Sequence, residues 1–171
     1  MEWYQKSANQ GFPDAQYNLG VMYAKGQGVR QDYRKAVEWY QKAANQGFAA
    51  AQLNLGAMYS NGQGVRQDYR KAVEWYQKAA NQGFAAAQYN LGTMYLQGKG
   101  VRQDYRKAVE WYQKASNQGL ANAQHNLGVM YARGQGFRQD YHKAKEWFGL
   151  SCDNGYQLGC DAYKELNQRG F

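Results

Sequence analysis

The chain has 171 residues, of which 44% are hydrophobic and 20% charged, and its 5 Trp, 16 Tyr and 6 Phe exclude a disordered polypeptide, which lacks such an aromatic content. The formal net charge of +8 is compatible with nucleic acid, anionic lipid or acidic protein as a partner. No apolar run approaches the roughly 20 residues that span a bilayer, and the first residues have neither the basic stub nor the apolar core of an export signal.

A repeat of 36 residues organises the whole sequence. The stretch GVRQDYRKAVEWYQKA occurs unchanged at 28–43, 64–79 and 100–115. Tryptophan and glycine recur at the same spacing, as Trp3, Trp39, Trp75, Trp111 and Trp147 and as Gly11, Gly47, Gly83, Gly119 and Gly155. The positive surplus is copied with the repeat, as +2 (14–49), +2 (50–85), +3 (86–121) and +1 (122–157), so the sequence alone predicts no polybasic patch.

Each repeat is predicted to form two helices. The first covers about 14–25, has apolar residues at helical spacing, and is followed by Gly26, which suits the left-handed conformation that ends a helix. The second begins at Asp32, a typical N-cap, carries Trp39 on its apolar stripe, and ends at Gly47. Helices this short depend on packing, so the pairs must stack into a solenoid with a continuous core.

The repeats predict a single all-α domain over 1–171. We expect an N-terminal half repeat (1–13), four full repeats (14–49, 50–85, 86–121 and 122–157) and a C-terminal capping helix (158–171). The closing helix is more polar than its counterparts, which is typical of a terminal cap. The half repeat leaves one helix without its partner, and that face is a candidate for self-association.

The sequence AQYNLGVMYAKGQGVRQDYRKAVEWYQKAANQG and its copies resemble the Sel-1-like repeat family, which is related to the tetratricopeptide repeats. The LG pair, the GxG-V loop, the DYxKA-x-x-WY segment and the closing AA-x-x-G all match in order. The resemblance implies a right-handed superhelix of antiparallel helix pairs that scaffolds protein complexes, with many members bacterial.

The ending WFGLSCDNGYQLGC resembles the cysteine-rich bacterial branch of that family, whose repeats carry a C-x7-C bridge. This resemblance implies a disulfide between Cys152 and Cys160, and two reduced thiols are the alternative. An oxidised pair favours a periplasmic or secreted location with a signal peptide already removed, whereas a reduced pair favours the cytoplasm.

One face of the first helices varies from copy to copy, while the second helices barely change over the first three repeats. The freely varying positions fall within an arc of about 100° on a helix, opposite the packed positions. In the related tetratricopeptide architecture this face lines the concave wall, so it is either a binding surface or idle solvent-facing surface. The candidate partner-binding residues are Tyr17, Asn18, Val21, Lys25, Leu53, Asn54, Tyr89, Asn90, Thr93, Leu96, His125, Asn126 and Arg133.

The asparagines of this set do not vary, although asparagine is an indifferent helix former, so a required hydrogen bond is expected. By resemblance to tetratricopeptide repeats they would clamp the backbone of a bound peptide. A bond between repeats is the alternative.

No pattern for catalysis or for a metal or cofactor site is present. His125 and His142 lie on different predicted helices without companion ligands, and no S-x-x-K, G-x-S-x-G or H-E-x-x-H occurs. The predicted function is therefore a non-enzymatic scaffold that binds a peptide or protein segment on its concave face. The alternatives are a penicillin-binding or β-lactamase-like protein of the cysteine-rich type, and a basic surface for acidic ligands or nucleic acid, of which nucleic acid is disfavoured because the charge is spread.

Overall fold

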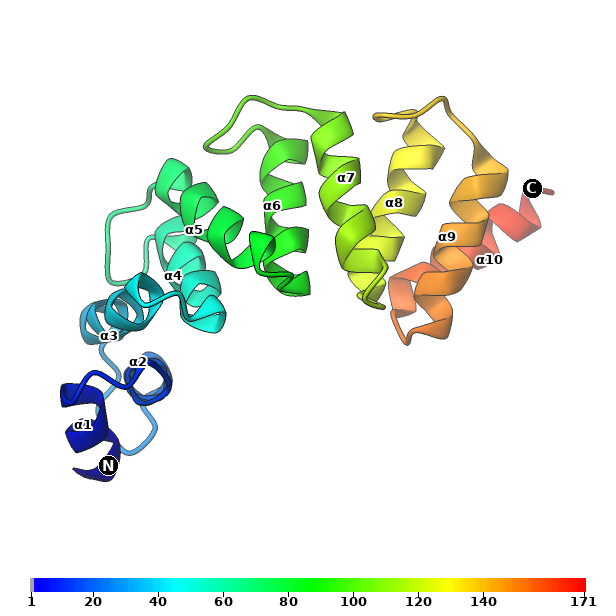
Figure 1. Ribbon diagram of the computed structural model, residues 1–171. Coiled ribbons are helices and arrows are strands. Elements are labelled where there is room, and N and C mark those ends of the chain that lie inside the picture. Colours follow the sequence, from blue (N-terminus) through cyan, green and yellow to red (C-terminus); the bar gives the residue numbers. More distant parts are fainter. Residues whose placement is uncertain (1) are drawn as a thin grey trace. The chain divides into compact units, whose positions relative to one another are not determined.

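A computed structural model describes residues 2–171, with side chains from Tyr4 onward, and Figure 1 shows its helices in chain order. The described residues form ten α-helices and no strand: α1 (Glu2–Asn9), α2 (Pro13–Lys25), α3 (Tyr33–Asn45), α4 (Ala49–Asn61), α5 (Tyr69–Asn81), α6 (Ala85–Gln97), α7 (Tyr105–Ser116), α8 (Ala121–Arg133), α9 (Tyr141–Asp153) and α10 (Gln157–Gln168). None of the helices in this described part is long and apolar enough to cross a membrane.

The chain divides into two compact units, Met1–Phe84 and Ala85–Phe171, and within each unit consecutive helices pack against one another. In the first unit α2 pairs with α3 and α4 with α5, while α6 pairs with α7 and α8 with α9 in the second. The predicted all-α class and the helix pairs of each repeat are therefore confirmed.

The second helix of each repeat begins where the sequence predicts, at an aspartate. The Asp32 carboxylate accepts hydrogen bonds from the backbone N–H groups of Arg34 (3.0 Å) and Lys35 (3.1 Å), which have no partner inside the helix. The first helix ends at Gly26, whose φ of 69° is the left-handed conformation that glycine adopts without strain.

A contact between glycine and an aromatic ring closes each helix pair. A Cβ atom placed on Gly20 would lie 2.6 Å from the ring of Tyr40, so the two helices approach at a distance that only glycine permits. The other pairs are Gly56 with Tyr76, Gly92 with Tyr112 and Gly128 with Phe148. The aromatic residues of these pairs are at most 5% exposed, and they form the centre of the core in both units.

Buried glutamines connect successive repeats. Gln52 is 4% exposed, and its amide donates to the backbone carbonyl of Ala44 (3.1 Å), at the end of the preceding second helix. Its side-chain oxygen accepts a hydrogen bond from Gln82 (2.8 Å). Because both ends of the amide are satisfied, the glutamine is a specific bridge and not an unpaired polar group in the core.

A disulfide joins Cys152 to Cys160 at the C-terminal end of the second unit, as the resemblance to the cysteine-rich branch implies. Cys160 stands one repeat after the buried Gln124, and Cys152 one repeat after Ser116, whose carbonyl lies 3.5 Å from the Gln124 amide. The disulfide thus takes the place of the link between glutamine and carbonyl and fastens α10 to α9.

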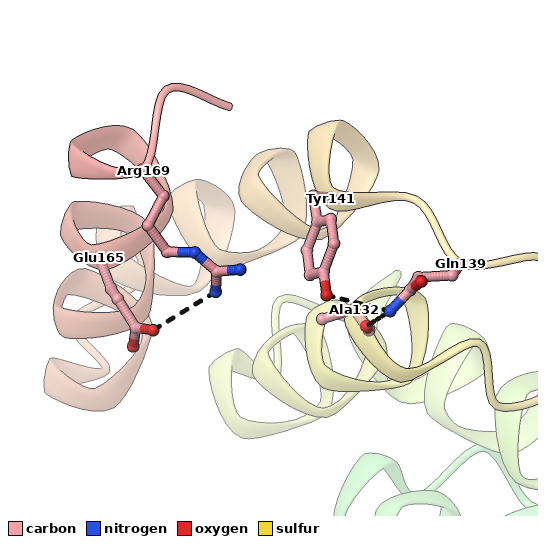
Figure 2. A network of polar contacts seen from close by, with 5 residues as sticks. All are labelled: Ala132, Gln139, Tyr141, Glu165 and Arg169. Carbon is pink, nitrogen blue, oxygen red and sulfur yellow. Dashed lines mark hydrogen bonds and ion pairs between the residues drawn. The ribbon is translucent and has the colours of Figure 1, made fainter.

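The cap is also held by contacts from its last turn, as Figure 2 shows. Arg169 is paired with Glu165 on α10 (3.6 Å), and its guanidinium lies 5.2 Å from the ring centre of Tyr141 on α9. The Tyr141 hydroxyl accepts a hydrogen bond from Gln139 (3.0 Å), whose amide also donates to the carbonyl of Ala132 (2.8 Å). The loop between α8 and α9 and the capping helix therefore meet at one tyrosine.

Substitution of Gly128 by alanine should destabilise the second unit by about 1–3 kcal/mol, because the new methyl group overlaps the buried Phe148 ring. Gly149→Ala is the matched control, since Gly149 is also helical but its added Cβ would lie 3.4 Å from Tyr163, an ordinary contact. In the control variant the free energy of unfolding should rise by about 0.5–1 kcal/mol, because alanine has a higher helix propensity than glycine. Urea unfolding measures both, and equal stability changes would contradict the proposed close approach.

Removal of the disulfide by the pair C152A and C160A should lower the unfolding free energy of the second unit by about 2 kcal/mol, because the unfolded chain regains freedom. The pair C152A and C160Q restores the residues found at this link in the first two repeats. It should recover about 1 kcal/mol through the amide-to-carbonyl hydrogen bond. Thermal unfolding of the two variants gives the comparison, and identical melting temperatures would show that the two links are not equivalent.

Candidate functional site

The residues predicted to bind a partner lie on one face of the first helices, α2 and α4 in the first unit and α6 and α8 in the second. We call this the first-helix face. In the first unit Tyr17 is half-buried, and its ring centre lies 5.9 Å from that of Tyr40 and 5.2 Å from that of Phe48. One edge of the ring packs on α3 and on the residue that begins α4, and the remainder is open to solvent.

The same arrangement recurs in the second unit. Tyr89 lies 5.6 Å from Tyr112 between ring centres, and His125 lies 5.3 Å from Phe148 and 5.4 Å from Tyr156. Burial lowers the pKa of His125, so the imidazole is neutral near pH 7. Tyr17, Tyr89 and His125 are therefore neither in the dry seam between helices nor fully exposed. They form a partly packed aromatic surface.

Asparagine side chains of this face are bonded to tyrosine hydroxyls from the preceding second helix. The Asn54 amide acts on the Tyr40 hydroxyl as a donor that lowers its pKa, and Asn126 acts on Tyr112 in the same way. The Asn126 amide also donates to the Tyr89 hydroxyl (3.5 Å). The Thr93 hydroxyl is 2.9 Å from that of Tyr112, which gives this tyrosine a second partner. The hydrogen bond that the invariant asparagine was expected to make is thus found within the protein, between neighbouring repeats.

The remaining predicted residues divide by exposure. Val21, Asn18, Asn90 and Leu96 are half-buried, whereas Lys25 and Arg133 are exposed at the ends of their helices. Each unit therefore brings its own subset together, with a polar and aromatic centre and one basic residue at the margin. Among residues 2–171 no cluster of histidine, cysteine and carboxylate side chains is suited to a metal ion.

The candidate set drawn from the sequence does not include Tyr40 and Tyr112, although their hydroxyls reach the first-helix face. The available signal was the difference between these tyrosines and Phe148, which fills the same repeat position without a hydroxyl. Burial raises the pKa of both tyrosines to about 12, and the hydrogen bonds from asparagine and threonine reduce that effect. Both hydroxyls are consequently neutral at physiological pH and can donate as well as accept.

Comparison with known proteins identifies the architecture. The Sel1 repeat family model matches residues 1–12, 13–48, 49–84, 85–120 and 121–156. The chain belongs to the Sel1 repeat family. Sel1 repeat proteins are generally protein-interaction scaffolds. No curated protein matches the sequence.

Solved structures of Sel1 repeat proteins superpose closely on this one. The structure of c5321, a protective antigen of uropathogenic Escherichia coli with an SLR fold, has a TM-score of 0.98 at 41% identity over all of this chain. A Sel1 repeat protein from Oxalobacter formigenes has a TM-score of 0.91 at 36% identity, over 99% of this chain and 69% of that one. This Sel1 repeat chain spans only 37% of the length of the Escherichia coli protein.

The Helicobacter pylori cysteine-rich protein B is a more distant structural neighbour, with a TM-score of 0.60 and 27% identity over 80% of this chain and 98% of that one. These matches confirm the all-α repeat solenoid and the resemblance to both branches of the family.

The stability of this Sel1 repeat protein should fall as the pH rises above 10. Up to the ordinary tyrosine pKa of 10 both the folded and the unfolded state keep the Tyr40 proton, but from there to about 12 the unfolded state loses it first. Urea unfolding between pH 9 and pH 12 should therefore show a smaller decline for Tyr40→Phe than for the unmodified protein. An unchanged pH dependence would contradict the raised pKa.

Proposed function

We propose that this Sel1 repeat protein is a non-enzymatic scaffold whose first-helix face binds an extended segment of a protein partner. The observation that supports this proposal best is the partial exposure of the varying aromatic residues. Tyr17, Tyr89 and His125 pack on one edge and present the other to solvent, so they are held in place before any partner arrives. Binding then orders few side chains, which lowers its entropic cost.

The chemistry of the face suits a peptide. Tyrosine offers a large contact area with few rotatable bonds and a hydroxyl that can reach a peptide group. Leu53 and Leu96 add apolar contacts, while Lys25 and Arg133 at the helix ends supply donors for carbonyl or carboxylate groups. A segment with apolar and hydrogen-bonding side chains in alternation is the partner that such a surface fits.

The asparagines enter this proposal as positioning residues. Because Asn54 is bonded to the Tyr40 hydroxyl, one side of its amide is engaged within the protein. An amide has two donor hydrogens and an acceptor oxygen, so a bound backbone can still pair with the remaining groups. The hydrogen bond fixes the orientation in which those groups face the partner.

The disulfide supports a periplasmic or secreted location as part of the same proposal, because such bonds persist in oxidising compartments. A catalytic role receives no support from the described residues. The hydroxyls of Tyr40 and Tyr112 have pKa values of about 12, which makes them poor nucleophiles at neutral pH.

The proposal predicts that Tyr17→Leu combined with Tyr89→Leu weakens the binding of peptides selected on the protein from a random display library. Leucine is chosen because Leu53 occupies the same position in the second repeat, so packing on the second helix is preserved. We expect a loss of about tenfold in affinity, corresponding to about 1.4 kcal/mol. Fluorescence anisotropy with a labelled peptide measures it.

The matched control is Glu38→Gln combined with Glu110→Gln, two exposed residues of the second helices. The control should bind as the unmodified protein does, and both variants should keep its melting temperature within a few degrees. Selected peptides that bind both variants equally well would show that the first-helix face is not the binding surface.

A further inference from the structure

The net positive charge of the protein is gathered at the loops between the two helices of each repeat. We define the loop edge as residues 25–35, 61–71, 97–107 and 133–143. It holds fourteen basic and four acidic side chains, a net charge of +10, whereas the rest of the chain carries −2 and brings the total to +8. Each repeat carries a small positive net charge of +1 to +3, and counting the charge by repeat hides the difference between the two ends of the helices.

Open pockets lie at the loop edge in three of the repeats. They have volumes of about 710 Å³ in the first repeat, 660 Å³ in the third and 560 Å³ in the fourth. Two arginines and a lysine line the first and third pockets, and the fourth has histidine in place of one arginine. These cations are Arg30, Arg34 and Lys35, then Arg102, Arg106 and Lys107, and finally Arg138, His142 and Lys143.

The arginines of these pockets are available to an external anion. Arg30, Arg34, Arg102 and Arg106 are exposed, and none forms an ion pair with a described residue. The aspartate in each pocket does not compete for them, because its carboxylate caps the helix. Asp104, for example, accepts from the backbone N–H of Lys107 (3.0 Å). The same bond occupies a first-turn N–H group of the helix, so an anion in the pocket would meet mainly the arginine and lysine side chains.

The loops that carry these cations are braced from within. Gln31 donates to the carbonyl of Ala24 (2.8 Å) and to the hydroxyl of Tyr33 (3.0 Å), which ties the loop to both helices. The equivalent glutamines of the other repeats also donate to the end of the first helix, at 2.8 Å in each case. A fixed loop presents its arginines at a constant spacing and lowers the entropic cost of binding.

We propose that the loop edge is a second interaction surface, which shares only Lys25 and Arg133 with the first-helix face, and that it binds the carboxylate side chains of an acidic segment in a protein partner. The planar guanidinium forms paired hydrogen bonds with a carboxylate, and clusters of arginine are a common means of recognising acidic motifs. Within the second unit, the separate pockets of the third and fourth repeats match side chains spaced along a polypeptide.

Nucleic acid fits this surface less well, because a lysine already lies over one aromatic ring in the first pocket and one in the third. The Lys35 ammonium lies 5.3 Å from the ring centre of Tyr23, and Lys107 stands in the same position over Tyr95. A base stacks on an open aromatic face, and single-stranded nucleic acid gains much of its affinity in this way. Carboxylate groups need only the exposed arginines.

The test is the binding of a fluorescein-labelled oligoglutamate peptide to the full chain at low salt, followed by anisotropy. The loop-edge variant replaces Arg30, Arg34, Arg102 and Arg106 by glutamine. The control variant replaces Lys6, Lys42, Lys78 and Lys114 by glutamine, which removes the same charge from exposed positions outside the loop edge. We expect at least about a tenfold loss of affinity for the loop-edge variant and a much smaller loss for the control.

Equal losses in the two variants would overturn the proposal, because they would show attraction to net charge alone. Absence of binding by the unmodified protein would also overturn it, as would tighter binding of a single-stranded oligonucleotide of equal charge than of oligoglutamate. Circular dichroism checks that both variants remain folded. Because no residue of the first-helix face is changed, loss of oligoglutamate binding is separable from failure of that face to bind its own peptides.

Discussion

The aromatic ring that rests on a glycine backbone is the contact on which each helix pair depends. It sets how closely the two helices approach, and it occupies the space that any larger residue at Gly20 or its copies would need. The same ring determines the surface above it. The Tyr40 hydroxyl lies at the first-helix face, where the Asn54 amide donates to it, so the core contact and the candidate binding surface share one side chain. A change in the core pairing would therefore alter the surface as well.

The repeat made the fold readable from the sequence. A glycine, an aspartate and an aromatic residue recurring every 36 residues fix the ends and the inner faces of the helices without reference to distant contacts. The N-caps, the left-handed glycines and the paired helices all follow from local chemistry. The disulfide was predicted in another way, from the resemblance of the last repeat to the cysteine-rich branch of the family. What the structure adds is that Cys160 replaces a buried glutamine that bridges the earlier repeats.

The candidate surfaces were only partly predictable. Periodicity places Tyr17 and its copies on one helix face, but the partner of each ring lies on the following helix and depends on how the loop returns the chain. The sequence predicts that the invariant asparagine makes a hydrogen bond. It does not identify the acceptor, because many polar groups could lie within reach of that side chain. The loop edge was missed for a different reason. A charge count for each repeat does not show where in the repeat the charges lie. The pairing of the helices shows that the basic residues on both sides of the connecting loop lie at the same end of the helix pair.

The two surfaces differ in how much they vary from repeat to repeat, and that difference favours different roles. The first-helix face carries Tyr17, Leu53, Tyr89 and His125 at one repeat position, so successive repeats offer different side chains to a partner. The loop edge keeps its two arginines and lysine nearly unchanged in every copy. Selectivity between partners needs chemically distinct contacts, whereas long-range attraction and fast association need only a consistent field of one sign. A scaffold built from near-identical units can thus combine both, because the glycine and ring that close each helix pair leave Tyr17 and its copies free to vary and do not fix the charge of the loop.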